Sequence, residues 1–183
     1  MANLDIAQLG NPVLRQVAQP VYHVQDAEMQ TLINDLLETL RQANGVGIAA
    51  PQVGHSVRVL VVASRPNPRY PHAPHMEPLA MINPHIISHS EEMVSDWEGC
   101  LSVPGIRGLV PRYKEIEVEY TTPDGKLERR DMSDFVARIF QHEFDHLNGM
   151  VFLDRLENTH DTMTDQEYLE RVVSRTTVHS DTL

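Results

Sequence analysis

The segment from Ser133 to Gly149 constrains the fold most, because it combines a helical pattern with two histidines at helical spacing. Its apolar residues include Phe135, Val136, Ile139, Phe140 and Leu147. Ser133 can cap the start of a helix, and Gly149, after an asparagine, can end it. On a helix His142 and His146 would point to the same side, with Glu143 beside them. We therefore expect a helix that carries two ligands of one metal ion.

The pattern His-Glu-x-x-His predicts a catalytic metal site. Such a site has three protein ligands and a fourth position for water, whose pKa the ion lowers toward neutrality. Glu143 is placed to act as the acid/base that handles the proton of this water. Because the pattern fixes only three positions in a chain with 10 histidines, a third ligand is needed to support it.

The third ligand has more than one candidate. The longer pattern with a third histidine matches through Gly149, but Phe152 stands where that histidine is needed, so this class is excluded. Glu167 or Glu170 could complete a His/His/Glu site if the terminal helix packs alongside. Cys100 is chemically favoured, because a thiolate is a strong ligand for zinc or ferrous iron.

Cys100 is the only cysteine of the chain. An internal disulfide is therefore impossible, and we expect a compartment where thiols stay reduced, by default the cytosol. The glycine before it and the Pro104-Gly105 turn after it favour a loop or strand end that presents the sulfur. A small core side chain or a nucleophile stays open as an alternative role, although a nucleophile would leave Glu143 unexplained.

A segment of small residues, 45–54, precedes an expected strand. It contains the pattern GxGxxA, but a helix is expected before it and Pro51 follows directly, whereas a dinucleotide-binding fingerprint follows a strand and opens a helix. Nucleotide binding is therefore disfavoured. The small residues let a backbone approach a ligand closely, and Gln52 can donate an amide hydrogen bond; the alternative is a plain helix-to-strand turn.

The rest of the chain predicts several short elements. We expect an irregular arm at 9–20, an amphipathic helix from Asp26 to Asn44 and a short helix after Thr164. Strands are expected at 57–63, 79–82, 85–88, 93–97, 107–110 and 116–120, with a turn at 123–125. Five of the 12 prolines lie in 64–78, which predicts an extended surface loop. His72 and His75 in that loop are expected to be solvated rather than metal ligands.

Length and charge limit the domain organisation and the partners. With 183 residues and 41% hydrophobic content, we expect one domain, 1–183, with a core at about 9–156, a linker and terminal helix at 157–175 and a loose tail at 176–183. The net charge of -11 disfavours DNA and anionic membranes as partners. Neither a membrane span nor a signal peptide is expected, since no sufficiently long apolar run occurs.

Taken together, the segments 45–52, 98–102 and 141–149 resemble the three signature motifs of the peptide deformylases, in that order and with family-like spacing. The arm at 11–15 is also similar to the start of that family, so the resemblance covers about 9–156. It implies an α+β fold in which antiparallel β-sheets wrap around the central motif-bearing helix, with a further N-terminal and a short C-terminal helix. The implied reaction removes the N-terminal formyl group from the formyl-methionine of newly synthesised polypeptides and releases formate.

The resemblance also implies roles for individual residues. Cys100, His142 and His146 would hold one divalent metal ion, usually ferrous iron (Fe2+) in this family, with zinc, nickel or cobalt able to substitute. Metal-bound water would attack the formyl carbon while Glu143 shuttles the proton, and Gln52 with the Leu101 backbone N–H would bind the developing oxyanion. The residues implied to line the substrate cleft are Val46, Gly47, Ile48 and Gly99.

The chain departs from the family in two places. The proline-rich loop is longer than the family's minimal connection, and we expect it to shape the cleft entrance. Bacterial members often carry a terminal helix linked to ribosome docking, but from residue 155 onward this chain has six acidic and three basic residues, which disfavours attraction to ribosomal RNA. At most a transient association with the ribosome is therefore expected. Two other classes stay open: a His/His/Glu peptidase, and a metal-stabilised binding module, against which Glu143 argues.

Overall fold

The computed structural model describes residues 2–175, which contain three α-helices and eight β-strands. The helices are α1 (Ala27–Gln42), α2 (Asp134–Leu147) and α3 (Asp165–Tyr168), the last continued by a π-helical turn, Leu169–Val173. Short 3-10 helices lie at Pro12–Arg15, Ala50–Val53 and Phe152–Arg155. The strands are β1 (Gly47–Ala49), β2 (Val59–Ser64), β3 (Met76–His89), β4 (Met93–Cys100), β5 (Val103–Tyr113), β6 (Glu115–Thr121), β7 (Leu127–Ser133) and β8 (Thr162–Thr164).

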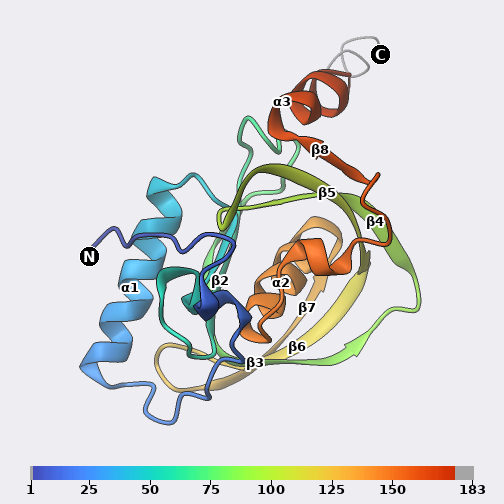
Figure 1. Ribbon diagram of the computed structural model, residues 1–183. Helices are drawn as coiled ribbons and strands as arrows, with labels where there is room; N and C mark the ends of the chain where they lie inside the picture. Colours follow the sequence, from blue (N-terminus) through green and yellow to red (C-terminus); the bar gives the residue numbers. More distant parts are fainter. Residues whose placement is uncertain (1, 176–183) are drawn as a thin grey trace.

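Two antiparallel sheets curve around α2 (Figure 1). One sheet has the strand order β1-β2-β3-β6-β7, and the other has the order β4-β5-β8. The pairing of β3 with β6 shifts register between Ile82 and His85 and again between Ile86 and Ser88. Such irregularities bend a strand, which lets the long β3 follow the curve around the helix.

The helices α1 and α2 cover opposite faces of the larger sheet. Leu60 and Val62 of β2 belong to the core cluster formed with Phe140 of α2. Val59 and Val61, which alternate with them, pack in the cluster formed with Leu36 of α1. Successive side chains of a strand point to opposite faces, so a strand covered on both faces must be apolar at every position. This explains the continuous apolar run of β2.

The predicted fold class, α+β with sheets around the motif-bearing helix, is confirmed. The helix α1 follows Asp26 but ends at Gln42, and Asn44 takes a positive φ of 50° at the turn beyond it. The helix α2 has the predicted bounds, and Ser133 stands at its N-cap position, but the Ser133 side chain makes no capping hydrogen bond. The short helix predicted after Thr164 is α3, and the Thr164 side chain caps it by accepting a hydrogen bond from the Glu167 N–H.

The strand predictions were partly wrong. The two short strands expected at 79–82 and 85–88 are one strand, β3, whose start at Met76 also takes in the end of the predicted proline-rich loop. The strand expected at 107–110 extends over Val103–Tyr113. No strand was predicted at Leu127–Ser133, because this edge strand is mostly exposed and charged and so lacks an apolar alternation.

The predicted loose tail at 176–183 lies outside the described residues. Within 2–175, no helix is long and apolar enough to cross a membrane.

Candidate metal centre and substrate pocket

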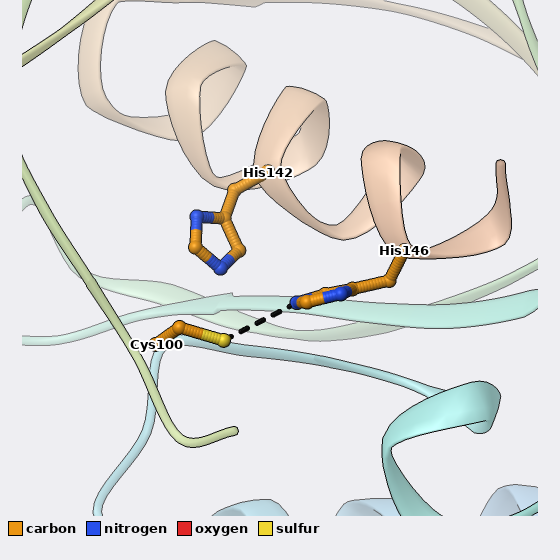
Figure 2. A group of neighbouring side chains, drawn as sticks. All are labelled: Cys100, His142 and His146. Carbon is orange, nitrogen blue, oxygen red and sulfur yellow. Dashed lines mark hydrogen bonds between the residues drawn. The ribbon is translucent and has the colours of Figure 1, made fainter. Parts of the chain in front are cut away.

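Three potential metal ligands converge between the end of β4 and α2. Cys100 is the last residue of β4, and His142 and His146 project from neighbouring turns of α2 toward it (Figure 2). One ligand atom of each residue lies within 4.8 Å of the others, and the Cys100 Sγ is 3.3 Å from the His146 Nε2. A thiolate and two imidazoles suit a divalent transition metal, so these three residues are arranged as a group that could hold such an ion.

The glutamates of the terminal helix do not reach this cluster. In the part of the chain that the structure describes, no other group of three His, Cys, Asp or Glu residues is arranged to hold a metal. Glu167 pairs with Arg171, and Glu170 accepts a hydrogen bond from Gln166, all within the same terminal segment. The alternative His/His/Glu site therefore finds no support.

Glu143 lies beside the cluster with a free oxygen. Its Oε2 is buried and has no hydrogen-bond partner among the described residues. A buried carboxylate oxygen without a partner is costly, which suggests that a ligand or water normally meets it. Burial raises the pKa of Glu143 to about 7. A carboxyl group with such a pKa can both accept and return a proton near neutral pH.

Cys100 is held in a state that favours metal binding. Burial alone would raise the pKa of its thiol, but the neighbouring His146 and His142 outweigh that effect, and the pKa of Cys100 lies well below its ordinary value. The thiolate is the form that binds metals. The Ser102 N–H also points at this sulfur, with a distance of 3.4 Å from N to Sγ.

Glu98 orients His142 from the side opposite the cluster. The Nδ1 of His142 is 2.9 Å from the Glu98 Oε2. Arg112 donates to both oxygens of Glu98, at 2.9 and 3.0 Å, and Arg138 donates to Oε1 at 2.8 Å. Burial opposes ionisation of Glu98, but the charge of Arg112 and the hydrogen bonds from His142 and Arg112 lower the pKa of Glu98. An ionised Glu98 favours the His142 tautomer whose Nε2 is free for a metal.

Arg112 extends this network along α2. Its Nη1 donates to the Asp145 Oδ2 at 2.6 Å, and Arg155 donates to both oxygens of Asp145 at 2.6 and 3.1 Å. A central helix can carry buried charges only if each one is paired. Here the partners come from β4, β5 and the segment after α2, so the same contacts that satisfy the charges fix the helix in the sheets.

Gln52 lies on the other side of Cys100 with a fixed amide. Its Oε1 accepts a hydrogen bond from the Ala49 N–H at 2.8 Å. Its Nε2 donates to the Ser102 Oγ at 3.2 Å and lies 3.5 Å from the Cys100 Sγ. Leu101 lines the same pocket, and its N–H has no hydrogen bond to a described residue. Both groups are thus placed as donors at the edge of the metal cluster.

A pocket opens in front of the cluster. Of the residues expected to line the cleft, Val46, Gly47 and Gly99 line this pocket. A Cβ on Gly47 would lie 2.5 Å from the Glu143 Oε1, so only glycine allows this close approach. Ile48 is different: its side chain is fully buried in the cluster under α1. Neighbouring residues of a strand face opposite sides, so Ile48 points away from the side that Gly47 presents to the pocket.

Several pocket residues were missed in the sequence. Tyr70, Trp97, Arg107, Phe135 and Ile139 also line the pocket. Tyr70 lies in the proline-rich segment, and no local pattern shows that this segment returns to the pocket. Glu98 could have been found, because a metal-binding histidine commonly donates its second N–H to a carboxylate, and Glu98 stands two residues before Cys100.

Comparisons with known proteins agree with this geometry. The family model described as "Polypeptide deformylase" matches residues 3–162. "Peptide deformylase 2" of Nostoc sp. is 62% identical over 173 residues, which cover 94% of this chain and 97% of the relative. A crystal structure of a class I type b peptide deformylase from Acinetobacter baumannii, bound to Met-Ala-Ser, has a TM-score of 0.83 and 45% identity, and covers 85% of this chain and 99% of its own. One from Synechococcus elongatus, in complex with actinonin, has a TM-score of 0.76 and 36% identity, with coverages of 94% and 85%.

Proposed function

The chain belongs to the peptide deformylase family, whose members remove the formyl group from N-terminal formyl-methionine, and we propose how its own residues carry out that hydrolysis. Cys100, His142 and His146 would hold the metal ion, and Glu143 would be the acid/base. The observation that carries this assignment is the unpartnered Oε2 of Glu143 beside the Cys/His/His cluster in a pocket.

The metal is proposed to be ferrous iron. The support is the family resemblance and the donor set, since one thiolate and two imidazoles suit Fe2+ as well as zinc, nickel or cobalt. When bound, the ion would polarise the formyl oxygen and lower the pKa of the attacking water. Its identity has to be measured by metal analysis of protein purified without oxygen.

Glu143 would move the proton during the reaction. Its carboxylate takes a proton from the attacking water and later delivers it to the nitrogen of the leaving methionine amine. The pKa of about 7, caused by burial, lets Glu143 perform both transfers near neutral pH. Gly47 leaves the space that the Glu143 side chain occupies, because a Cβ at this position would lie 2.5 Å from the Glu143 Oε1.

Gln52 and Leu101 would bind the oxygen on which negative charge develops. The Gln52 amide is oriented by its bond from Ala49, so its Nε2 would not need to reorganise during the reaction. Donors that are fixed in advance stabilise a transition state most effectively, and loss of one costs about a hundredfold to a thousandfold in rate. The Leu101 N–H is proposed as the second donor.

The substrate is proposed to be a formyl-methionyl peptide in the pocket lined by Val46, Gly47 and Gly99. Support comes from the Acinetobacter baumannii relative, which is bound to Met-Ala-Ser, a peptide of the kind that deformylation leaves. Ile48 is not included, because its side chain is buried in the core. We further propose that the chain acts as one catalytic domain in the cytoplasm, where newly made polypeptides and reduced thiols occur together. Transient ribosome association stays a prediction.

The test is a formate-release assay with formyl-Met peptides on metal-loaded protein. The unmodified chain should release formate, and Glu143→Gln should lose nearly all of the rate while it keeps the metal. The matched control is Glu28→Gln, which changes an exposed glutamate of α1. Cys100→Ser should lower the bound metal. Failure of the unmodified chain to release formate would overturn the proposal.

A further inference from the structure

A buried arginine joins three distant segments at the outer wall of the pocket. Arg107 of β5 is 2% exposed. Its Nε donates to the Asp165 Oδ1 at 2.6 Å, and its Nη1 donates to the Tyr70 hydroxyl at 2.7 Å. The guanidinium carbon also lies 4.7 Å from the ring centre of Tyr168. Arg107 thus lies between α3, which is far from α1 in Figure 1, and the segment before β3.

Arg107 lies next to the reacting centre. It pairs with Gly99 across β4 and β5, and a Cβ on Gly99 would lie 2.6 Å from the Arg107 Cζ. The guanidinium therefore rests on the backbone of Gly99, one residue before the metal ligand Cys100. Arg107 and Tyr70 both line the pocket that contains Glu143.

The guanidinium still has donors to offer. It carries five N–H groups, of which the bonds to Asp165 and Tyr70 engage only two. The Nη2 of Arg107 has no hydrogen bond to another residue in 2–175. This nitrogen is not fully buried, so an acceptor from outside can reach it. Asp165 already balances the positive charge, so a neutral acceptor fits better than a second carboxylate. A backbone carbonyl oxygen of a bound peptide is such an acceptor.

We propose that Arg107 binds a backbone carbonyl of the substrate peptide beyond its formyl-methionine, and that Asp165 and Tyr168 are positioning residues that hold Arg107 in place. This inference rests on the proposed function. Tyr168 also donates its hydroxyl to the Arg69 carbonyl at 3.1 Å, which ties α3 to the segment that carries Tyr70. Both positioning residues lie beyond residue 162, where the match to the family model ends. The terminal helix would thereby take part in peptide binding.

The experiment compares peptide lengths on the metal-loaded full chain. The substrates are the amides of formyl-Met, formyl-Met-Ala and formyl-Met-Ala-Ser, whose blocked ends remove any terminal carboxylate. Asp165→Asn and Tyr168→Leu should raise KM for the longest substrate by about tenfold, the scale of one hydrogen bond to a charged group, with kcat little changed. KM for formyl-Met amide should stay the same. Calorimetric binding of Met-Ala-Ser amide, a product without a formyl group, should weaken to a similar degree.

The matched control is Glu167→Gln, which removes an acidic charge from the same helix but contacts Arg171 instead of Arg107. Metal content and thermal unfolding of each variant exclude a general loss of structure, and Asp165→Asn serves if Tyr168→Leu does not fold. An unchanged KM for the longest substrate would overturn the inference, as would an equal rise for all three lengths. Inactivity of the unmodified chain would instead count against the proposed function.

Discussion

Replacement of Glu98 by glutamine tests whether the buried charges around α2 hold the metal centre. Glu98 is 3% exposed and accepts hydrogen bonds from Arg112 and Arg138 as well as from His142. With Asp145 and Arg155, the network contains two carboxylates and three guanidinium groups. Glu98→Gln leaves one buried carboxylate, Asp145, with the two buried guanidinium groups of Arg112 and Arg138 and the exposed one of Arg155. It also removes the carboxylate that fixes the His142 tautomer.

The expected effect has two separate parts. Removal of one partner from a buried ion pair costs about 3–5 kcal/mol in the free energy of unfolding, because the remaining charge stays buried without compensation. Loss of the carboxylate behind a metal-binding histidine lowers metal affinity by about 10- to 100-fold. The loss of stability should persist in metal-free protein, since Arg112 and Arg138 lose the Glu98 carboxylate in either state, and Arg112 then has only Asp145 as an anionic partner. The loss of affinity appears only in a metal titration.

Urea unfolding of metal-free protein and a competition titration with a chelator measure the two parts. The matched control is Glu119→Gln, which breaks a surface pair with Arg129, whose side chain is 61% exposed. An exposed pair contributes only about 0–1 kcal/mol, so this variant should unfold almost as the unmodified chain does. If Glu98→Gln were no less stable than Glu119→Gln and bound metal equally well, the role assigned to the buried network would be refuted.

Three further predictions follow from the glycines and the metal. Gly47→Ala should lower kcat/KM by about a hundredfold, because the added Cβ would lie 2.5 Å from the Glu143 Oε1 and would displace the Glu143 side chain. Unchanged kinetics would contradict this. Gly149→Ala should lower the free energy of unfolding by more than about 1 kcal/mol, because its φ is positive and the added Cβ would lie 2.8 Å from the Arg15 carbonyl oxygen. Gly10 also has a positive φ but has open space around it, so Gly10→Ala should cost less in the same urea titration. Removal of the metal by a chelator should lower the thermal unfolding midpoint, since free metal at about 100 times its Kd stabilises the folded state by about 2.7 kcal/mol. An unchanged midpoint would argue against a bound ion in the folded chain.

The sequence predicted the elements whose evidence is local. His142 and His146 belong to one helix, so their spacing alone places both imidazoles on one side. The strand β2 was found because both of its faces are buried and every residue before its last, Ser64, is apolar. The strand β7 was missed for the opposite reason, since its side chains are mostly exposed and only pairing with β6 makes it a strand.

The long-range contacts of the site could not be predicted from spacing. From the residues alone, Cys100 and the terminal glutamates stayed open as the third ligand. Thiolate chemistry and the family resemblance favoured the cysteine, but only the fold shows that it lies beside α2. Arg107 and Tyr70 carry no local pattern, because their meeting requires both the pairing of β4 with β5 and the return of the proline-rich segment. Ile48 shows a different limit. It belongs to a motif whose residues were expected to line the substrate cleft, but side chains alternate along β1, and the Ile48 side chain lies in the core.

The central position of α2 also has a consequence for biosynthesis. A ribosome makes β1 to β7 before α2, so the inner faces of these strands leave the exit tunnel without the helix that covers them. Exposed apolar strands at this stage are prone to aggregate. The charged edge strand β7, with Glu128, Arg129 and Arg130 in succession, emerges directly before α2 and resists pairing with other chains. Because β7 is made just before α2, a charged edge strand limits pairing of the exposed sheet with other chains until α2 covers its inner face.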